Sequence, residues 1–117
     1  MKAEDLKKRT KLFALSIISL YRKLPKTGEA KIVGNQLLRC GTSVGSNYRA
    51  ACRGRSNREF YAKLCIVVEE ADETVFWLEI LDEAHILSSS HVQPLLKEAT
   101  EILAIMASSR KTAGKRI

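Results

Sequence analysis

Apolar residues recur with a helical period in four segments of this chain, and short polar breaks separate the segments. The first segment places Leu6, Phe13, Ile17, Leu20 and Leu24 on one helix face. The 117 residues include only two prolines and six glycines, too few for the many turns of an all-β fold. Because short loops make sequential helices neighbours, the pattern predicts an all-α fold, an antiparallel up-down-up-down four-helix bundle.

The breaks between the segments set the expected limits of the helices. We expect one domain over residues 1–109, with helices at about 3–24, 29–53, 57–87 and 91–108, followed by a mobile basic tail at 110–117. Pro25 ends the first helix, and Gly54 suits the position just after the second. Capping boxes at 56–59 (Ser-x-x-Glu) and 90–93 (Ser-x-x-Gln) begin the third and fourth helices.

The second expected helix has an apolar and a cationic face, and no acidic residue lies between Lys31 and Arg53. The apolar face comprises Val33, Leu37, Cys40, Val44, Tyr48 and Ala51. The other face carries a cationic stripe that spans about 80° of arc and comprises Lys31, Arg39, Arg49 and Arg53. Gly34, Gly41 and Gly45 share a third strip, and each costs a helix about 1 kcal/mol relative to Ala. The glycine strip predicts the close approach of another backbone.

Charge is divided along the chain. Residues 1–58 carry 14 basic and 3 acidic residues, residues 59–109 carry 2 and 10, and residues 110–117 carry 4 and none. Two explanations remain open for the cationic stripe and for Arg55 and Arg58 beside it. The arginines contact phosphates, which their forked guanidinium groups bind well. Alternatively, they pair within or between subunits with acidic residues of the third helix, namely Glu69, Glu70, Glu73 or Glu83.

The third expected helix has a second apolar face, formed by Ile66, Trp77, Ile80 and Ala84. A helix that is apolar on two sides packs on both, so the second side of a bundle this small indicates contact with another subunit. The residues expected at this subunit interface are Ile66, Glu70, Glu73, Trp77 and Ile80. On the second helix, Ser43 and Asn47 are expected to form an interhelical hydrogen bond, with a nucleotide contact as the alternative.

Residue patterns typical of catalysis or metal binding do not occur. Glu70 and Glu73 are three residues apart, but neither His85 nor His91 completes the Glu-x-x-His pattern of a di-metal bundle. We therefore expect no enzymatic activity, no metal and no cofactor. The three cysteines form no Cys-x-x-Cys pair, and no apolar run approaches 18 residues. These features predict a cytoplasmic protein that is not in a membrane.

Several motifs resemble a known family. They are Gln36-Leu37-Leu38-Arg39, Thr42-Ser43-Val44-Gly45, Asn47-Tyr48-Arg49 and Glu70-Ala71-Asp72-Glu73-Thr74 with Trp77-Leu78. They resemble the bacterial four-helix-bundle family encoded in intervening sequences of large-subunit (23S) rRNA genes. That family is similar to the accessory proteins of diversity-generating retroelements, which are basic, pentameric and bind nucleic acid. The resemblance implies a ring-shaped homopentamer and a protein partner such as a reverse transcriptase, but no established activity.

One position departs from the family pattern. Members of the family often carry Glu directly after the Asn-Tyr-Arg unit, where this chain has Ala50. If that Glu balances an arginine in its relatives, this chain has a more exposed positive charge at the same place.

The predicted function is non-enzymatic binding of RNA or DNA through a cationic helix face, without strong sequence specificity. The alternative is an interaction module in which the cationic helix pairs with the acidic third helix of a neighbouring subunit. The residues expected to bind nucleic acid are Lys31, Arg39, Arg49, Arg53, Arg55, Arg58, Arg110, Lys111, Lys115 and Arg116.

Overall fold

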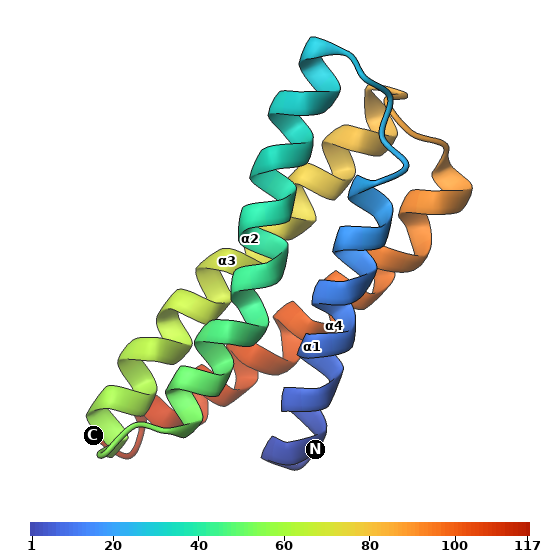
Figure 1. Cartoon of the computed structure of the whole chain (residues 1–117). Coiled ribbons are helices and arrows are strands. Elements are labelled where there is room, and N and C mark those ends of the chain that lie inside the picture. Colours follow the sequence, from blue (N-terminus) through green and yellow to red (C-terminus); the bar gives the residue numbers. More distant parts are fainter.

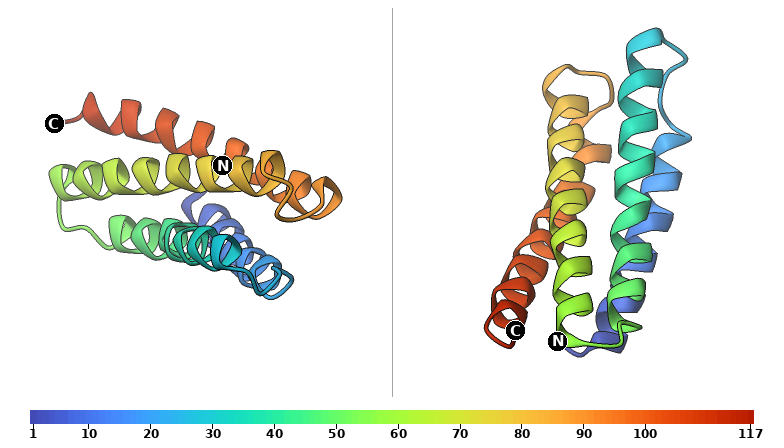
Figure 2. Two further views of the ribbon diagram at one scale, coloured as in Figure 1. Left: turned by 90° about the horizontal axis from the view of Figure 1, so that it is seen from above. Right: turned by 90° about the vertical axis from the view of Figure 1, so that its left-hand side faces the viewer.

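The computed structural model describes all residues from 1 to 117 and consists of four helices joined by short loops (Figure 1). The helices are α1 (Ala3–Tyr21), α2 (Gly28–Cys52), α3 (Asn57–Glu83) and α4 (Ser89–Gly114). Each helix packs on the next one in the chain, and α1 touches α4 more lightly. The bundle is elongated, with Cα extents of 46 × 22 × 20 Å (Figure 2). The predicted all-α up-down arrangement is confirmed.

The apolar faces of all four helices meet in one core. Ile17 of α1, Leu37 of α2, Leu78 of α3 and Ile102 of α4 are each at most 1% exposed. Burying a side chain of this size contributes about 1.5–3 kcal/mol, so these helices depend on one another more than on their intrinsic propensities. The face predicted for the first helix is buried except at Leu24, which is half-buried.

Two helices end earlier than their apolar patterns predict. The first ends at Tyr21 rather than near residue 24, because the residue before Pro25 is disfavoured in the helical conformation. The third ends at Glu83 rather than near residue 87. There His85 adopts a left-handed conformation (φ 55°), and its N–H donates to the Asp82 carbonyl at 3.1 Å. The Ile86 N–H donates to the Leu81 carbonyl at 3.0 Å, which completes a Schellman motif.

The fourth helix is longer at both ends than the sequence predicts. It begins at Ser89, so the capping box expected at 90–93 is wrong, and the Gln93 side chain instead donates to Asp82 Oδ2 at 2.8 Å. It continues to Gly114, so the segment expected as a mobile tail is largely helical. Its last turn is held because Ala113 is buried and Gly114 packs against the ring of Tyr61.

The cap predicted at the start of the third helix is confirmed. The Glu59 N–H donates to Ser56 Oγ at 3.1 Å, and Ser56 has the extended backbone of an N-cap residue. Gly54 follows the C-cap residue Arg53, which is the expected position, although its φ is not positive. The turn that joins α2 to α3 is therefore fixed by local sequence on both sides.

The glycine strip of α2 faces α1, and the predicted close approach of another backbone occurs at Gly45. A Cβ atom at Gly45 would lie 3.2 Å from the backbone carbonyl oxygen of Thr10, so the two backbones are close there. At Gly41 the neighbour is a side chain, and a Cβ atom would lie 2.9 Å from Cγ1 of Ile17. The glycines thus allow α1 to lie in contact with α2 along its length.

The interhelical hydrogen bond expected of Ser43 and Asn47 does not form. Ser43 Oγ donates to the Cys40 carbonyl at 3.0 Å, and Asn47 Nδ2 donates to the Ser43 carbonyl at 2.9 Å. Both side chains are half-buried and are satisfied by the backbone of α2 itself, as is common for short polar side chains within helices.

Candidate functional site

Arg39, in the middle of the cationic stripe, pairs with two carboxylates of α3 in the same chain. Its Nη1 donates to Glu70 Oε2 at 3.2 Å, and its Nη2 donates to Glu73 Oε2. The expectation that arginines of α2 pair with α3 therefore holds for this residue. Because both acidic partners are engaged, Arg39 is the member of the stripe least able to bind an external phosphate.

The residues expected at a subunit interface lie on the side of α3 next to this ion pair. Glu73 also accepts a hydrogen bond from Trp77 Nε1 at 3.1 Å, so the Trp77 ring is fixed against the pair. Trp77 and Ile80 are half-buried, and Ile66 is 38% exposed. Phe76, which the sequence pattern did not single out, is 50% exposed and lies edge-to-face against Trp77 with ring centroids 4.9 Å apart.

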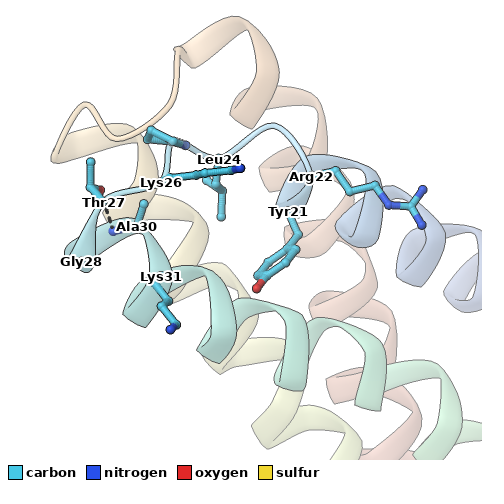
Figure 3. Close-up of a pocket in the computed structure, with 9 residues that line it drawn as sticks. Tyr21, Arg22, Leu24, Lys26, Thr27, Gly28, Ala30 and Lys31 are labelled. Atoms are coloured by element: carbon cyan, nitrogen blue, oxygen red, sulfur yellow. Dashed lines mark hydrogen bonds between the residues drawn. The ribbon is translucent and has the colours of Figure 1, made fainter.

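Lys31 lies near the start of α2, at the end of the bundle away from Arg53. With the loop between α1 and α2 it lines a hollow of about 530 Å³ (Figure 3). Figure 3 shows Arg22 and Lys31 extending away from each other on opposite sides of Tyr21. Tyr21 in turn donates its hydroxyl to Asn35 Oδ1 at 2.9 Å. The charged groups of this hollow do not converge, so we assign it no ligand.

The remaining cationic candidates gather at the other end of the bundle. The α2–α3 turn, the end of α4 and the start of α1 meet there (Figures 1 and 2). One hollow at this end is lined by Met1, Asn57 and Arg116, and another by Ala3 and Arg55. We call this surface the basic end and define it by seven residues: Arg53, Arg55, Arg58, Arg110, Lys111, Lys115 and Arg116.

None of the seven residues of the basic end forms an ion pair, whereas Arg9 and Arg39 elsewhere each pair with two carboxylates. Six of the seven are exposed, and Arg110 is half-buried. The acidic residues nearest in the sequence to this end are Glu4, Asp5 and Glu59. Arginine and lysine side chains that are close, exposed and unpaired create a local positive potential.

Arg49 extends this positive surface onto the long side of the bundle. It is exposed in the last turn of α2 and lines a groove with Lys7 and Lys11 of α1. The sequence pattern missed these two lysines, because the pairing of α1 with this face of α2 follows from the glycine strip rather than from charge. It also missed the pairing of Arg9 with Glu98 and Glu101 of α4.

Groups for other chemistry do not come together. No three His, Cys, Asp or Glu side chains are placed to hold a metal ion, and no helix is long and apolar enough to span a membrane. All three cysteines are free. Burial raises the pKa of the Cys40 thiol, which therefore stays protonated and poorly nucleophilic at neutral pH.

The fold and the charge distribution define the class of this protein as a basic, antiparallel four-helix bundle. Residues 3–108 match the model of the 23S rRNA-intervening sequence protein family, and the chain belongs to that family. It is also similar to a protein of unknown function from the S23 ribosomal protein family of Bacteroides thetaiotaomicron, known from its crystal structure. That likeness has 34% identity and a TM-score of 0.84, and it covers 95% of this chain and 99% of the other. No curated protein sequence is significantly similar to this chain.

Proposed function

We propose that this protein binds RNA or DNA through its basic end, without catalysis and without strong sequence preference. One observation carries the proposal. Two segments that are distant in the sequence place seven cationic side chains at one end of the bundle, and none of the seven is neutralised by an ion pair.

The chemistry of the basic end suits the phosphate backbone better than the bases. Five of its seven side chains are arginines, whose forked guanidinium groups bind phosphate oxygens bidentately. Contacts of this kind fix position and add affinity, but they read no base edge. The expected binding is therefore similar for different sequences and weakens steeply as salt rises, because each neutralised phosphate releases counterions.

The test is a fluorescence-anisotropy titration of a structured rRNA fragment, and of DNA of the same sequence, at two salt concentrations. We expect binding at low salt that falls strongly at the higher concentration. Arg53→Glu/Arg55→Glu should reduce affinity about 100-fold or more, because two contacts become two repulsions.

The matched control is Arg22→Glu/Lys26→Glu, which makes the same change in charge at the opposite end of the bundle. This control should reduce the affinity much less, because it changes the net charge of the protein but leaves the basic end intact. Absence of binding by the wild type at low salt contradicts the proposed function, and equal losses in the two variants reject the basic end as the site.

A second candidate function is a homo-oligomeric interaction module, and it is favoured by the outer face of α3. Ile66 and Phe76 are exposed there beside the carboxylates of Glu69 and Glu79. Glu70 and Glu73 already bind Arg39 in the same chain, so of the expected acidic partners Glu69 and Glu83 remain for a neighbouring cationic helix.

A further inference from the structure

A groove between α1 and α2 combines cationic side chains with small ones. Lys7 and Lys11 line it from α1, and Arg49 lines it from α2. The remaining lining residues are small: Ala14, Thr42, Gly45 and Ser46. Gly45 lies against the backbone of Thr10, whose carbonyl oxygen would be 3.2 Å from an added Cβ atom.

The size and charge of the groove favour a small anion over a drug-sized organic molecule. Its volume is about 230 Å³, below the range of about 300–1,000 Å³ that is typical of small-molecule pockets. Three of its seven lining side chains, those of Lys7, Lys11 and Arg49, are cationic. Neither Lys11 nor Arg49 has an ion-pair partner in the chain, so both side chains are free to bind an anion.

The groove is continuous with the basic end. Arg49 is in the last turn of α2, one turn before Arg53, and Lys7 is in the second turn of α1. The start of α1 and the end of α2 lie side by side at that end (Figures 1 and 2). A polyanion that covers the basic end therefore reaches the groove along the same face without crossing the acidic surface of α3.

We infer that the α1–α2 groove binds a phosphodiester of the nucleic-acid backbone, with Lys7, Lys11 and Arg49 as its contacts. This inference rests on the proposed function, and it assigns the path of the strand beyond the basic end. Because the groove offers charge and no base-reading pocket, RNA and DNA engage it equally.

Lys7 supplies an internal competitor for the phosphate. Its ammonium group pairs with Glu4 Oε1 at 2.9 Å, and the Glu4 side chain is 77% exposed. A phosphate that binds Lys7 displaces this carboxylate. Removal of the Glu4 charge should therefore tighten nucleic-acid binding, whereas most changes to a binding surface weaken it.

The first experiment compares Lys7→Gln/Lys11→Gln with Lys23→Gln/Lys97→Gln, which removes two exposed lysines outside the groove. Anisotropy titrations with the rRNA fragment and with DNA of the same sequence are run over a series of salt concentrations. The groove variant should bind about tenfold more weakly at low salt and show a salt slope reduced by about two, with little change in the control.

The second experiment compares Glu4→Gln with Asp5→Asn, which removes a neighbouring carboxylate that forms no ion pair. Glu4→Gln should tighten binding roughly two- to fivefold more than Asp5→Asn, in line with the small strength of an exposed ion pair. Equal effects of these two substitutions overturn the competition by Glu4.

The outcomes separate the two proposals. If the wild type binds nucleic acid and Arg53→Glu/Arg55→Glu weakens it, but the groove variant matches its control, the groove is rejected and the basic end stands. If the wild type binds neither nucleic acid at low salt, both proposals fail. Lysine-dependent binding to phosphatidylserine vesicles, without binding to nucleic acid, also overturns the inference.

Discussion

Arg9 is the main polar link between α1 and α4, which touch only lightly. Its Nε donates to Glu98 Oε2 at 2.7 Å, and its Nη2 donates to Glu98 Oε1 at 2.6 Å and to Glu101 Oε1 at 2.9 Å. Bidentate pairs of this kind are the stronger ion pairs in proteins. The hydrogen bonds from Arg9 hold the pKa of Glu98 below its ordinary value of 4.5.

The Glu98→Gln substitution should lower the free energy of unfolding by about 0.5–1 kcal/mol at pH 7, since the partly exposed pair is screened by water. A carboxyl group whose pKa is lowered by folding stabilises the protein above its unfolded-state pKa, and this contribution is lost as pH falls through the folded-state pKa. Urea unfolding should therefore show a difference at pH 7 that shrinks below pH 4.5. Glu79→Gln, at an exposed and unpaired residue, is the control. A difference independent of pH contradicts this role of Glu98.

At the scale of residues, the sequence predicts only some of the ion pairs. The sequence shows that basic residues of one half and acidic residues of the other lie on helix surfaces, and it predicts contacts between α2 and α3. Arg39 fulfils that prediction. Arg9 and Glu98 are 89 positions apart, and their pairing depends on how α4 crosses α1, which periodicity does not determine.

At the scale of helices, the glycine strip of α2 sets how closely α1 packs. A Cβ atom at Gly41 would lie 2.9 Å from Cγ1 of Ile17, a fully buried side chain that would have to shift. The gain in helix propensity from Ala, about 1 kcal/mol, is then opposed by overpacking of about 1–3 kcal/mol. Gly28 is the natural control, because a Cβ atom there meets nothing within 4 Å.

The Gly41→Ala substitution should therefore lower the midpoint of thermal unfolding, while Gly28→Ala leaves it unchanged or raises it slightly. Circular dichroism at the helical wavelength measures both. A more stable Gly41→Ala variant would show that α1 moves away from α2 at little cost, and would contradict the close packing inferred at this strip.

The existence and faces of the helices could be predicted from the sequence, but their ends only in part. Ser56 and Pro25 act through local backbone chemistry, so they mark ends that a sequence pattern reveals. The end of α3 depends on His85 in a left-handed conformation, which is uncommon for a residue other than glycine. The extension of α4 depends on contact between Gly114 and Tyr61, a tertiary effect that helix propensity does not contain.

At the scale of the whole molecule, the single chain exposes more surface than its mass requires. Its accessible surface is 7033 Å², whereas a compact monomer of 13.1 kDa exposes about 6,400 Å². Large apolar side chains form part of the exposed surface, and two groups of them lie on α3 and α1. Ile66 and Phe76 lie on the outer face of α3, and Leu12 and Leu15 lie on α1. An assembly of several copies, such as the homopentamer that the family resemblance implies, would cover one or both groups.

The outer face of α3 is the one that a subunit contact should cover, because its aromatic residues are ordered by the ion pair beneath them. Trp77 is held by Glu73, and Phe76 packs edge-to-face on Trp77.

The Ile66→Glu/Phe76→Glu variant should therefore dissociate the oligomer to a monomer in multi-angle light scattering while keeping its helical circular dichroism. Leu12→Glu/Leu15→Glu is the matched control on α1 and should leave the assembly intact. A wild type that is monomeric at all concentrations contradicts the oligomer, and dissociation by the α1 variant alone moves the contact to α1.

Because the basic end lies at the tip of each bundle, dissociation should also reduce the affinity for long nucleic acids by loss of multivalency, while binding to short fragments persists.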